Sequence, residues 1–331
     1  MLDIREQVSL KDHTVFKIGG PAKYFCEAKT AEELKDALAW ARGSALPFFV
    51  LGAGSNVLVS DNEFEGLVIK NKATNIKINP LGYPVAKWGV EAEAGLAPQK
   101  LYAEAGAQMA RVVAESVKAG LSGFEWAIGI PGTIGGSVRG NAGCFGSEMK
   151  DVIESVEVFD FLDAKRRTLE AGECNFGYRH SVFKEKPNLI VLSATLRFAK
   201  GDPKKSQGLI AEYSKKRLSS QDIGAKCAGC IFKNVEWSRK DVNKESLLQK
   251  YPELKPFSGQ KSIPAGFLLD FLGLKGTKAG AVQISEKHAN YFINLGGATA
   301  AEVIALINTA KEKIQNRYGI SLEEEIQKIN C

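Results

Sequence analysis

A glycine-rich loop at residues 52–56 constrains the fold of this chain more than any other feature. A helix and a short buried strand at 48–51 precede the loop, and strand-like segments follow it at 57–61 and 66–70. The glycine runs that bind phosphates in Rossmann and P-loop proteins open a helix instead. Because this loop leads into a strand, the sequence argues against both of those folds.

The backbone of this loop is suited to binding an anion. Consecutive N–H groups without side-chain bulk form a nest for a diphosphate, and nearby hydroxyl and amide groups add donors. The residues concerned are Gly52, Ala53, Gly54, Ser55 and Asn56. A tight turn would explain this one loop equally well.

A second glycine-dense stretch changes that balance. Within residues 127–146, the loop at its centre consists of Gly129, Ile130, Pro131, Gly132, Thr133, Ile134, Gly135 and Gly136. Turn glycines are rarely so concentrated, and glycine allows a ligand to approach the backbone closely. Two such loops in one chain favour a large, flat, phosphate-bearing cofactor held largely by backbone groups.

The remaining pattern predicts several domains, because 331 residues exceed what one hydrophobic core usually serves. We expect a helix from Met109 to Gly120 and alternating strands at 152–159 and 190–198. A candidate strand at 87–94 lies in a weakly patterned stretch, and a domain boundary falls near 201–203. Farther on, Thr299 and Glu302 form a capping box for the last long helix.

Charge and hydrophobicity limit which partners and which cellular location can be expected for this protein. The net charge of +6 is spread along the chain, with its densest basic group at 215–217, and most of these side chains are expected on a solvated surface. Without a basic face interleaved with aromatic side chains, we expect no nucleic-acid partner. No stretch approaches about 20 apolar residues, and the N-terminus lacks an apolar core. We therefore expect a cytoplasmic protein without membrane insertion. We also expect a monomer.

The six cysteines have no regular framework spacing and are expected to be reduced thiols. Cys227 and Cys230 form a C-x-x-C pair, which leaves a disulfide between them open. No second pair follows at zinc-ribbon spacing, and the chain has only three histidines, so no metal site is expected.

Six blocks occur in the order found in the UDP-N-acetylenolpyruvoylglucosamine reductase family, which this chain resembles from about residue 12 to 326. The blocks lie at 13–22, 51–61, 129–143, 176–184, 228–234 and 280–290. The block at 176–184 runs directly into a strand, so the chain looks closer to the short form of the family, which lacks an extra tyrosine-bearing loop.

The resemblance implies an α+β fold with a vanillyl-alcohol-oxidase-like FAD-binding domain in two parts, at 1–72 and 73–200. A C-terminal α+β substrate-binding domain would occupy 201–331. FAD would be bound non-covalently by the two glycine loops, with NADPH as the hydride donor. The implied reaction reduces UDP-N-acetylglucosamine enolpyruvate to UDP-N-acetylmuramate, a step of peptidoglycan precursor synthesis.

Three residues match the chemical positions of the family. Arg179 is expected to hold the substrate carboxylate and stabilise enolate-like charge. Glu325 is expected to assist charge stabilisation or proton delivery, although three adjacent glutamates leave its register open. Cys230 stands where many family members carry a serine that protonates C2 of the substrate. A thiol with a pKa of about 8.5 is a stronger acid than a hydroxyl; a buried structural cysteine is the alternative.

The same resemblance assigns the nucleotide part of the substrate to Lys233 and Asn234, with Tyr178, Gln283 and His288 as further substrate-side candidates. A charged segment at 236–262 lengthens the usual spacing between two of the blocks. It is either a surface insertion with helical content, or a lid or partner-binding element.

Two other functions stay open at this stage. One is a different FAD oxidoreductase of the same fold, such as an oxidase that passes electrons to oxygen. The other is a non-catalytic module that binds FAD or a UDP-sugar. The joint presence of Arg179, Cys230 and Glu325 favours the reductase over both.

Overall fold

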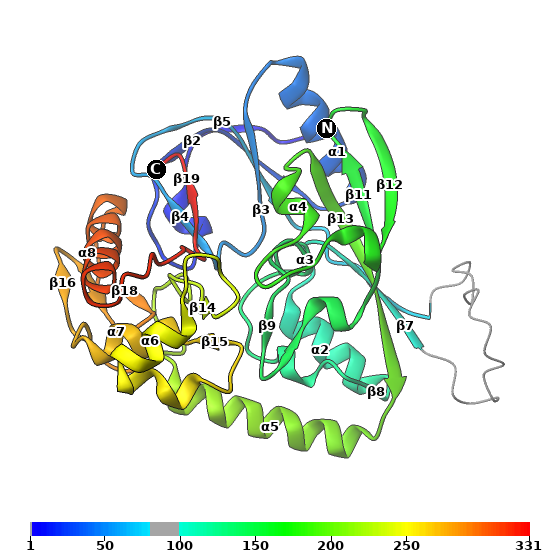
Figure 1. Ribbon diagram of the computed structural model, residues 1–331. Helices are drawn as coiled ribbons and strands as arrows, with labels where there is room; N and C mark the ends of the chain where they lie inside the picture. Colours follow the sequence, from blue (N-terminus) through cyan, green and yellow to red (C-terminus); the bar gives the residue numbers. More distant parts are fainter. Residues whose placement is uncertain (1, 80–98) are drawn as a thin grey trace. The chain divides into compact units, whose positions relative to one another are not determined.

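The computed structural model describes residues 2–79 and 99–331, so the candidate strand at 87–94 lies outside the described residues (Figure 1). The chain divides into two compact units, and each is built from three separate segments. Unit 1 comprises Met1–Val8, Ala22–Ala53 and Glu65–Ser219, and unit 2 comprises Ser9–Pro21, Gly54–Phe64 and Ser220–Cys331. The three domain ranges expected from the sequence stay a prediction.

The first sheet of unit 1 has the strand order β1-β2-β5-β3, in which β3 and β5 are parallel. Its strands are β1 (Arg5–Ser9), β2 (Pro21–Ala28), β3 (Phe48–Leu51) and β5 (Phe64–Asn71). Helix α1 (Ala31–Gly43) begins at Thr30, whose hydroxyl accepts a hydrogen bond from the Glu33 backbone. Leu34 and Leu38 of this helix are buried against Leu67 and Ile69 of β5, so the helix and the sheet share one core.

The second sheet of unit 1 is antiparallel and runs in the order β12-β11-β13-β7-β6, with β8 also paired to β13. Its strands are β6 (Ile76–Ile78), β7 (Gln99–Glu104), β8 (Leu121–Ser122), β11 (Ile153–Asp160), β12 (Lys165–Glu170) and β13 (Leu189–Lys200). The strands expected at 152–159 and 190–198 are thus confirmed as β11 and β13.

Helices cover the core of this second sheet. They are α2 (Met109–Lys118), α3 (Ile134–Gly140), α4 (Val182–Glu185), α5 (Pro203–Ser220) and the 3₁₀ turns η2 (Glu125–Ala127), η3 (Met149–Asp151) and η4 (Ala171–Cys174). The expected helix at Met109 is confirmed, and Met109, Val112 and Val113 are buried at the spacing of one helical face. A small hairpin of β9 (Gly143–Cys144) and β10 (Ser147–Glu148) follows α3.

Unit 2 is built around its longest helix, α8 (Ala300–Tyr318). The predicted capping box of Thr299 and Glu302 is present, and Gly319 ends the helix with a φ of 70°. Its other elements are η1 (Leu10–His13), β4 (Val57–Val59), β14 (Val235–Glu236), α6 (Lys244–Lys250), η5 (Pro252–Phe257), β15 (Ser262–Ile263), α7 (Ala265–Phe271), β16 (Lys278–Ala279), β17 (Val282–Ile284), β18 (Phe292–Asn294) and β19 (Gln327–Ile329). Strand β19 pairs in parallel with β4, which ties the end of the chain to the segment after the first glycine loop.

The charged segment at 236–262 is folded into unit 2. Leu247 and Leu254 are buried in the same core cluster as α8, and Trp237 Nε1 donates a hydrogen bond to the Phe257 carbonyl at 3.0 Å. The Tyr251 hydroxyl donates to the carbonyl of Arg317 on α8. This packing favours a well-ordered insertion over a lid.

Across residues 2–79 and 99–331, the structure contains no helix with the length and apolar character needed to cross a membrane.

Candidate active site

The two glycine loops contact each other within unit 1. Gly52 directly follows β3, and a Cβ added there would lie 2.6 Å from Thr133 Oγ1. Thr133 is also the N-cap of α3, where its hydroxyl accepts from the Gly136 N–H at 3.5 Å. Two loops that lie about 80 residues apart in sequence therefore meet at Gly52 and Thr133.

Glycine is needed in the first loop for its backbone as well. Gly54 has a φ of 72°, and a Cβ there would lie 2.5 Å from the His13 carbonyl oxygen. The Asn56 side chain donates to the Glu325 carbonyl at 3.2 Å. Ala53 is the last residue of unit 1 in this loop, and Gly54 to Asn56 belong to unit 2.

The loop at 129–136 fits the phosphate-bearing cofactor expected from the sequence. Gly129 and Gly132 have positive φ angles of 72° and 150°, which only glycine adopts without strain. The backbone is accessible, since Gly129, Pro131 and Gly136 are exposed while Thr133 is buried. The N–H groups of Ile130, Ile134 and Gly135 donate to carbonyls of the protein itself, so an anion would be bound by the other N–H groups of the loop.

Arg217 of α5 places a positive charge beside this loop. A Cβ at Gly129 would lie 2.9 Å from Arg217 Cδ, and the guanidinium donates to Cys144 Sγ at 2.8 Å. The residue is only 7% exposed, unlike its exposed neighbours Lys215 and Lys216. Sequence reasoning did not select Arg217 as a functional residue. The polar composition of α5 gives little signal in the sequence, and only the structure shows that Tyr213, four residues earlier, packs against the core on the same helical face.

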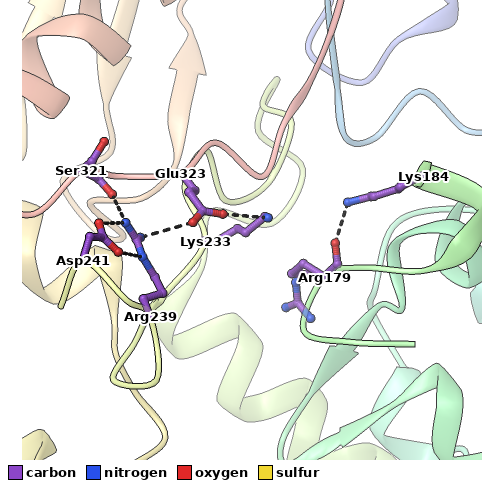
Figure 2. A network of polar contacts seen from close by, with 7 residues as sticks. All are labelled: Arg179, Lys184, Lys233, Arg239, Asp241, Ser321 and Glu323. Atoms are coloured by element: carbon purple, nitrogen blue, oxygen red, sulfur yellow. Dashed lines mark hydrogen bonds and ion pairs between the residues drawn. The ribbon is translucent and has the colours of Figure 1, made fainter. Parts of the chain in front are cut away.

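Arg179 lies at the tip of a tight turn in unit 1. The turn is closed by mutual backbone hydrogen bonds between Gly177 and His180, and Arg179 itself has a φ of 53°. Figure 2 shows the Lys184 ammonium donating to the Arg179 carbonyl, at 2.7 Å. The Arg179 guanidinium donates to the Gly143 carbonyl at 3.0 Å and lies over the Tyr178 ring. The turn thus holds the two candidates Tyr178 and Arg179 next to Gly143, the end of the second glycine-rich block.

Cys230 lies in an extended segment of unit 2 that has a neighbour on each side. On one side it forms an antiparallel bridge with Tyr291, and Ile231 N–H donates to the Asn290 carbonyl at 2.9 Å. On the other side, the Glu325 N–H donates to the Ile231 carbonyl at 2.7 Å. The structure therefore places the Glu325 backbone beside the residue that follows Cys230, although 95 positions separate Cys230 and Glu325 in the sequence.

The contacts of the three adjacent glutamates differ. Glu323 pairs with the Lys233 ammonium at 3.0 Å. Glu324 pairs with Lys311 and Lys328; burial opposes its charge, but these lysines hold the pKa of Glu324 below its usual value. Glu325 is the one whose backbone bonds the residue after Cys230. This arrangement favours Glu325 for the site position over its two neighbours.

Of the remaining substrate-side candidates of unit 2, Asn234 and His288 lie near the Cys230 segment, whereas Gln283 makes its contact elsewhere. Asn234 follows the Cys230 segment, and its side-chain oxygen accepts from the Ala265 N–H at the start of α7. His288 packs its ring against Tyr291, the bridge partner of Cys230, and burial lowers the pKa of His288. Gln283 on β17 instead donates to the Gly276 carbonyl at 3.4 Å.

Neither cysteine of the C-x-x-C pair forms a disulfide. Cys227 is buried, and this burial raises the pKa of its thiol. Cys230 is half-buried. In the part of the chain that the structure describes, no three His, Cys, Asp or Glu side chains gather in a way that could hold a metal ion.

Comparison with known proteins gives the class first. Residues 22–169 match the FAD binding domain family, and the described part of this range carries both glycine loops. With its mixed helices and strands, the chain is therefore an α+β protein with an FAD-binding domain, as expected. Residues 221–329 match a second family, "UDP-N-acetylenolpyruvoylglucosamine reductase, C-terminal domain".

Full-length relatives define the family. A UDP-N-acetylenolpyruvoylglucosamine reductase of Synechococcus sp. (strain JA-3-3Ab) is 36% identical over 98% of this chain and 90% of the relative. That of Carboxydothermus hydrogenoformans is 37% identical over 98% and 93%. The crystal structure of the Thermus caldophilus reductase aligns with a TM-score of 0.72 at 31% identity, covering 99% of both chains. The chain belongs to the UDP-N-acetylenolpyruvoylglucosamine reductase family.

Proposed function

We propose that this protein is an FAD-dependent reductase that uses NADPH to convert UDP-N-acetylglucosamine enolpyruvate to UDP-N-acetylmuramate for peptidoglycan synthesis. Family membership over 98% of the chain supports the reaction class. The observation that carries the chemical assignment is the backbone hydrogen bond from Glu325 to Ile231, which holds a carboxylate-bearing residue beside the Cys230 segment.

The cofactor would be held by the chain's two glycine loops. FAD, when bound, supplies the two-electron chemistry that moves a hydride from NADPH to C3 of the enolpyruvyl group. Gly52 lets the first loop lie against Thr133, Thr133 caps α3 at the second loop, Gly132 has a positive φ, and Arg217 adds positive charge next to Gly129. Ala53, Ser55, Asn56, Ile130, Pro131, Gly135 and Gly136 complete the two loops.

Reduction at C3 requires a proton at C2, and we assign its donation to the Cys230 thiol. A thiol has an intrinsic pKa of about 8.5, so it gives up a proton far more readily than an aliphatic hydroxyl. Glu325 assists by stabilising charge or passing on the proton. Arg179 pairs with the substrate carboxylate, because the guanidinium fork matches the two carboxylate oxygens. It thereby stabilises the enolate-like charge that develops.

The nucleotide end of the substrate is assigned to Lys233 and Asn234, which follow Cys230 on the same segment. Tyr178 and His288 are further substrate-side residues, next to Arg179 and Tyr291 respectively. Gln283 completes the set. We also propose a cytoplasmic, monomeric enzyme. Six cysteines outside any disulfide fit a reducing compartment, and sedimentation velocity tests the oligomeric state.

Anaerobic half-reactions test this proposal. The purified protein should show a flavin spectrum that NADPH bleaches and that UDP-N-acetylglucosamine enolpyruvate restores, with UDP-N-acetylmuramate as product. Flavin that stays bleached with this substrate but recovers quickly in air would indicate an oxidase instead. Protein that binds no flavin would contradict the assignment of the glycine loops.

A further inference from the structure

The insertion at 236–262 supplies an arginine that contacts the C-terminal segment of unit 2. Arg239 is held by Asp241 in a two-pronged pair, with Nε donating to Oδ1 at 3.0 Å and Nη2 to Oδ2 at 2.5 Å. The same Nη2 donates to the Ser321 carbonyl at 2.9 Å, and Nη1 lies 3.5 Å from Glu323 Oε1. Figure 2 shows contacts from this guanidinium to Asp241, Ser321 and Glu323, with Asp241 and Glu323 on opposite sides of it.

Glu323 connects Arg239 to a residue of the proposed site. Its second carboxylate oxygen, Oε2, accepts from the Lys233 ammonium at 3.0 Å, and its carbonyl accepts from the Lys233 N–H at 2.9 Å. One carboxylate is thus shared between two cations (Figure 2). The Arg239 side chain is 17% exposed and that of Lys233 26%, so neither position is freely mobile in water.

The charges of this group explain why the sharing matters. Arg239 and Lys233 carry two positive charges, and Asp241 and Glu323 carry two negative ones, so this group of four is neutral, while Glu236 adds a further negative charge near Arg239. Without Arg239 the group would carry one net negative charge, and Glu323 would pair with Lys233 alone. An ammonium held by an unshared carboxylate is less available to a diphosphate, and the excess negative charge repels an anionic substrate.

We propose that Arg239 is a positioning residue that shares Glu323 with Lys233 and so keeps the Lys233 ammonium available to the anionic nucleotide substrate. This inference rests on the proposed function, because it concerns how that substrate is bound. It gives the insertion a role in the affinity of the enzyme. Arg239 acts through Glu323 and has no part in hydride or proton transfer.

Steady-state kinetics of Arg239→Gln test the inference. At low ionic strength we expect the KM for the enolpyruvyl substrate to rise roughly fivefold with kcat within about twofold, since a partly exposed ion pair has a modest effect. The rise should shrink at high salt, because screening weakens charge effects near the surface. Arg239→Lys keeps the charge and should stay near the wild-type KM. An equal rise in KM for both variants would overturn the role of the charge.

Arg317→Gln is the matched control. Arg317 also pairs with an acidic residue of the insertion, Glu253 at 3.0 Å, but neither residue pairs with Glu323 or Lys233 in the contacts described above. We expect this variant to lose stability and to keep the wild-type KM. An equal rise in KM for Arg317→Gln and Arg239→Gln would mean that loosening the insertion, and not sharing of Glu323, causes the effect.

A double-mutant cycle identifies the route through Glu323. In a Glu323→Gln background the shared carboxylate is absent, so adding Arg239→Gln should change KM less than twofold, an estimate that follows from coupling of residues in one network. Additive effects of the two substitutions would overturn the inference.

Hydrogen exchange separates failure of this inference from failure of the proposed function. The Lys233 N–H is bonded to the Glu323 carbonyl, so Arg239→Gln should speed its exchange in the absence of any substrate. If the wild-type enzyme does not turn over this substrate, the proposed function fails. Unchanged exchange of the Lys233 N–H would overturn only the inference that Arg239 holds Lys233 in place through Glu323.

Discussion

Position 230 carries the thiol that we propose as the proton donor. Cys230→Ser should retain much of the turnover, because a hydroxyl can replace the thiol as the proton donor. Cys230→Ala should lower kcat by roughly 10²–10⁴-fold, the usual contribution of a general acid. Stopped-flow recovery of the flavin spectrum after prior reduction measures this step.

Cys227→Ser is the control for both variants, because this thiol is buried three residues away and has no assigned role. It should keep turnover close to wild type. Normal turnover in Cys230→Ala would show that the proton comes from another group.

Two neighbouring glutamates allow catalysis and stability to be separated. Glu325→Gln should lower kcat by roughly 10²-fold, as expected for loss of a group that stabilises charge in the transition state. Glu324→Gln should keep kcat within about twofold and instead destabilise the fold by about 1 kcal/mol, through loss of its pairs with Lys311 and Lys328. The opposite outcome would move the site residue to position 324.

The destabilisation from Glu324→Gln should depend on pH. Because the folded-state pKa of Glu324 is lowered, its contribution to stability is present above the unfolded pKa, near 4.5, and is lost as the pH falls through the lower folded value. The difference in melting temperature between wild type and variant should therefore be larger at pH 7 than at pH 3. A difference that grows on acidification would contradict the ion pairs.

At the residue scale, sequence patterns predicted which glycines form the loops, but they did not predict which side chains are buried. The glycines of both loops were identifiable because their spacing is unusual. Arg217 was grouped with exposed lysines, since a helix with a polar composition gives little sign of which basic side chain faces inward. The register of the C-terminal glutamates could not be predicted, because it depends on the lysines of α8 and β19 that pair with Glu324.

At the scale of elements, the contact between the two glycine loops can be tested with one methyl group. Gly52→Ala places a Cβ 2.6 Å from Thr133 Oγ1, the group that caps α3. Overpacking of this kind costs about 1–3 kcal/mol, and we expect weaker flavin binding and a lower melting temperature. Gly43→Ala at the end of α1 is the control, since no atom lies within 4 Å of its added Cβ. Equal flavin content in both variants would contradict the contact.

The insertion at 236–262 is the element that the sequence left undecided between a packed segment and a lid. Its apolar residues are few and are separated by charged ones, so no helical or strand period was visible. The structure buries Leu254 completely. Leu254→Ala should therefore lower the free energy of unfolding by about 2–5 kcal/mol, measured by denaturant unfolding. A cost below about 0.5 kcal/mol, typical of exposed positions, would indicate a loosely attached lid.

At the scale of the whole molecule, the fold class and the FAD-binding domain followed from the resemblance carried by six ordered blocks. The pairing of distant segments did not. Residues 230–232 lie between a segment at 290–291 and another at 323–325. Such pairing depends on three-dimensional packing that no local pattern encodes. The division into two units, each made of three chain segments, is equally invisible to a reading along the sequence.

The stoichiometry of NADPH oxidation tests the central claim most directly. Purified protein is given NADPH and UDP-N-acetylglucosamine enolpyruvate, once in air and once without oxygen, and both nucleotide products are quantified. A reductase predicts one UDP-N-acetylmuramate for each NADPH consumed, at the same rate in both atmospheres. NADPH oxidation that requires oxygen and yields hydrogen peroxide without UDP-N-acetylmuramate would contradict it.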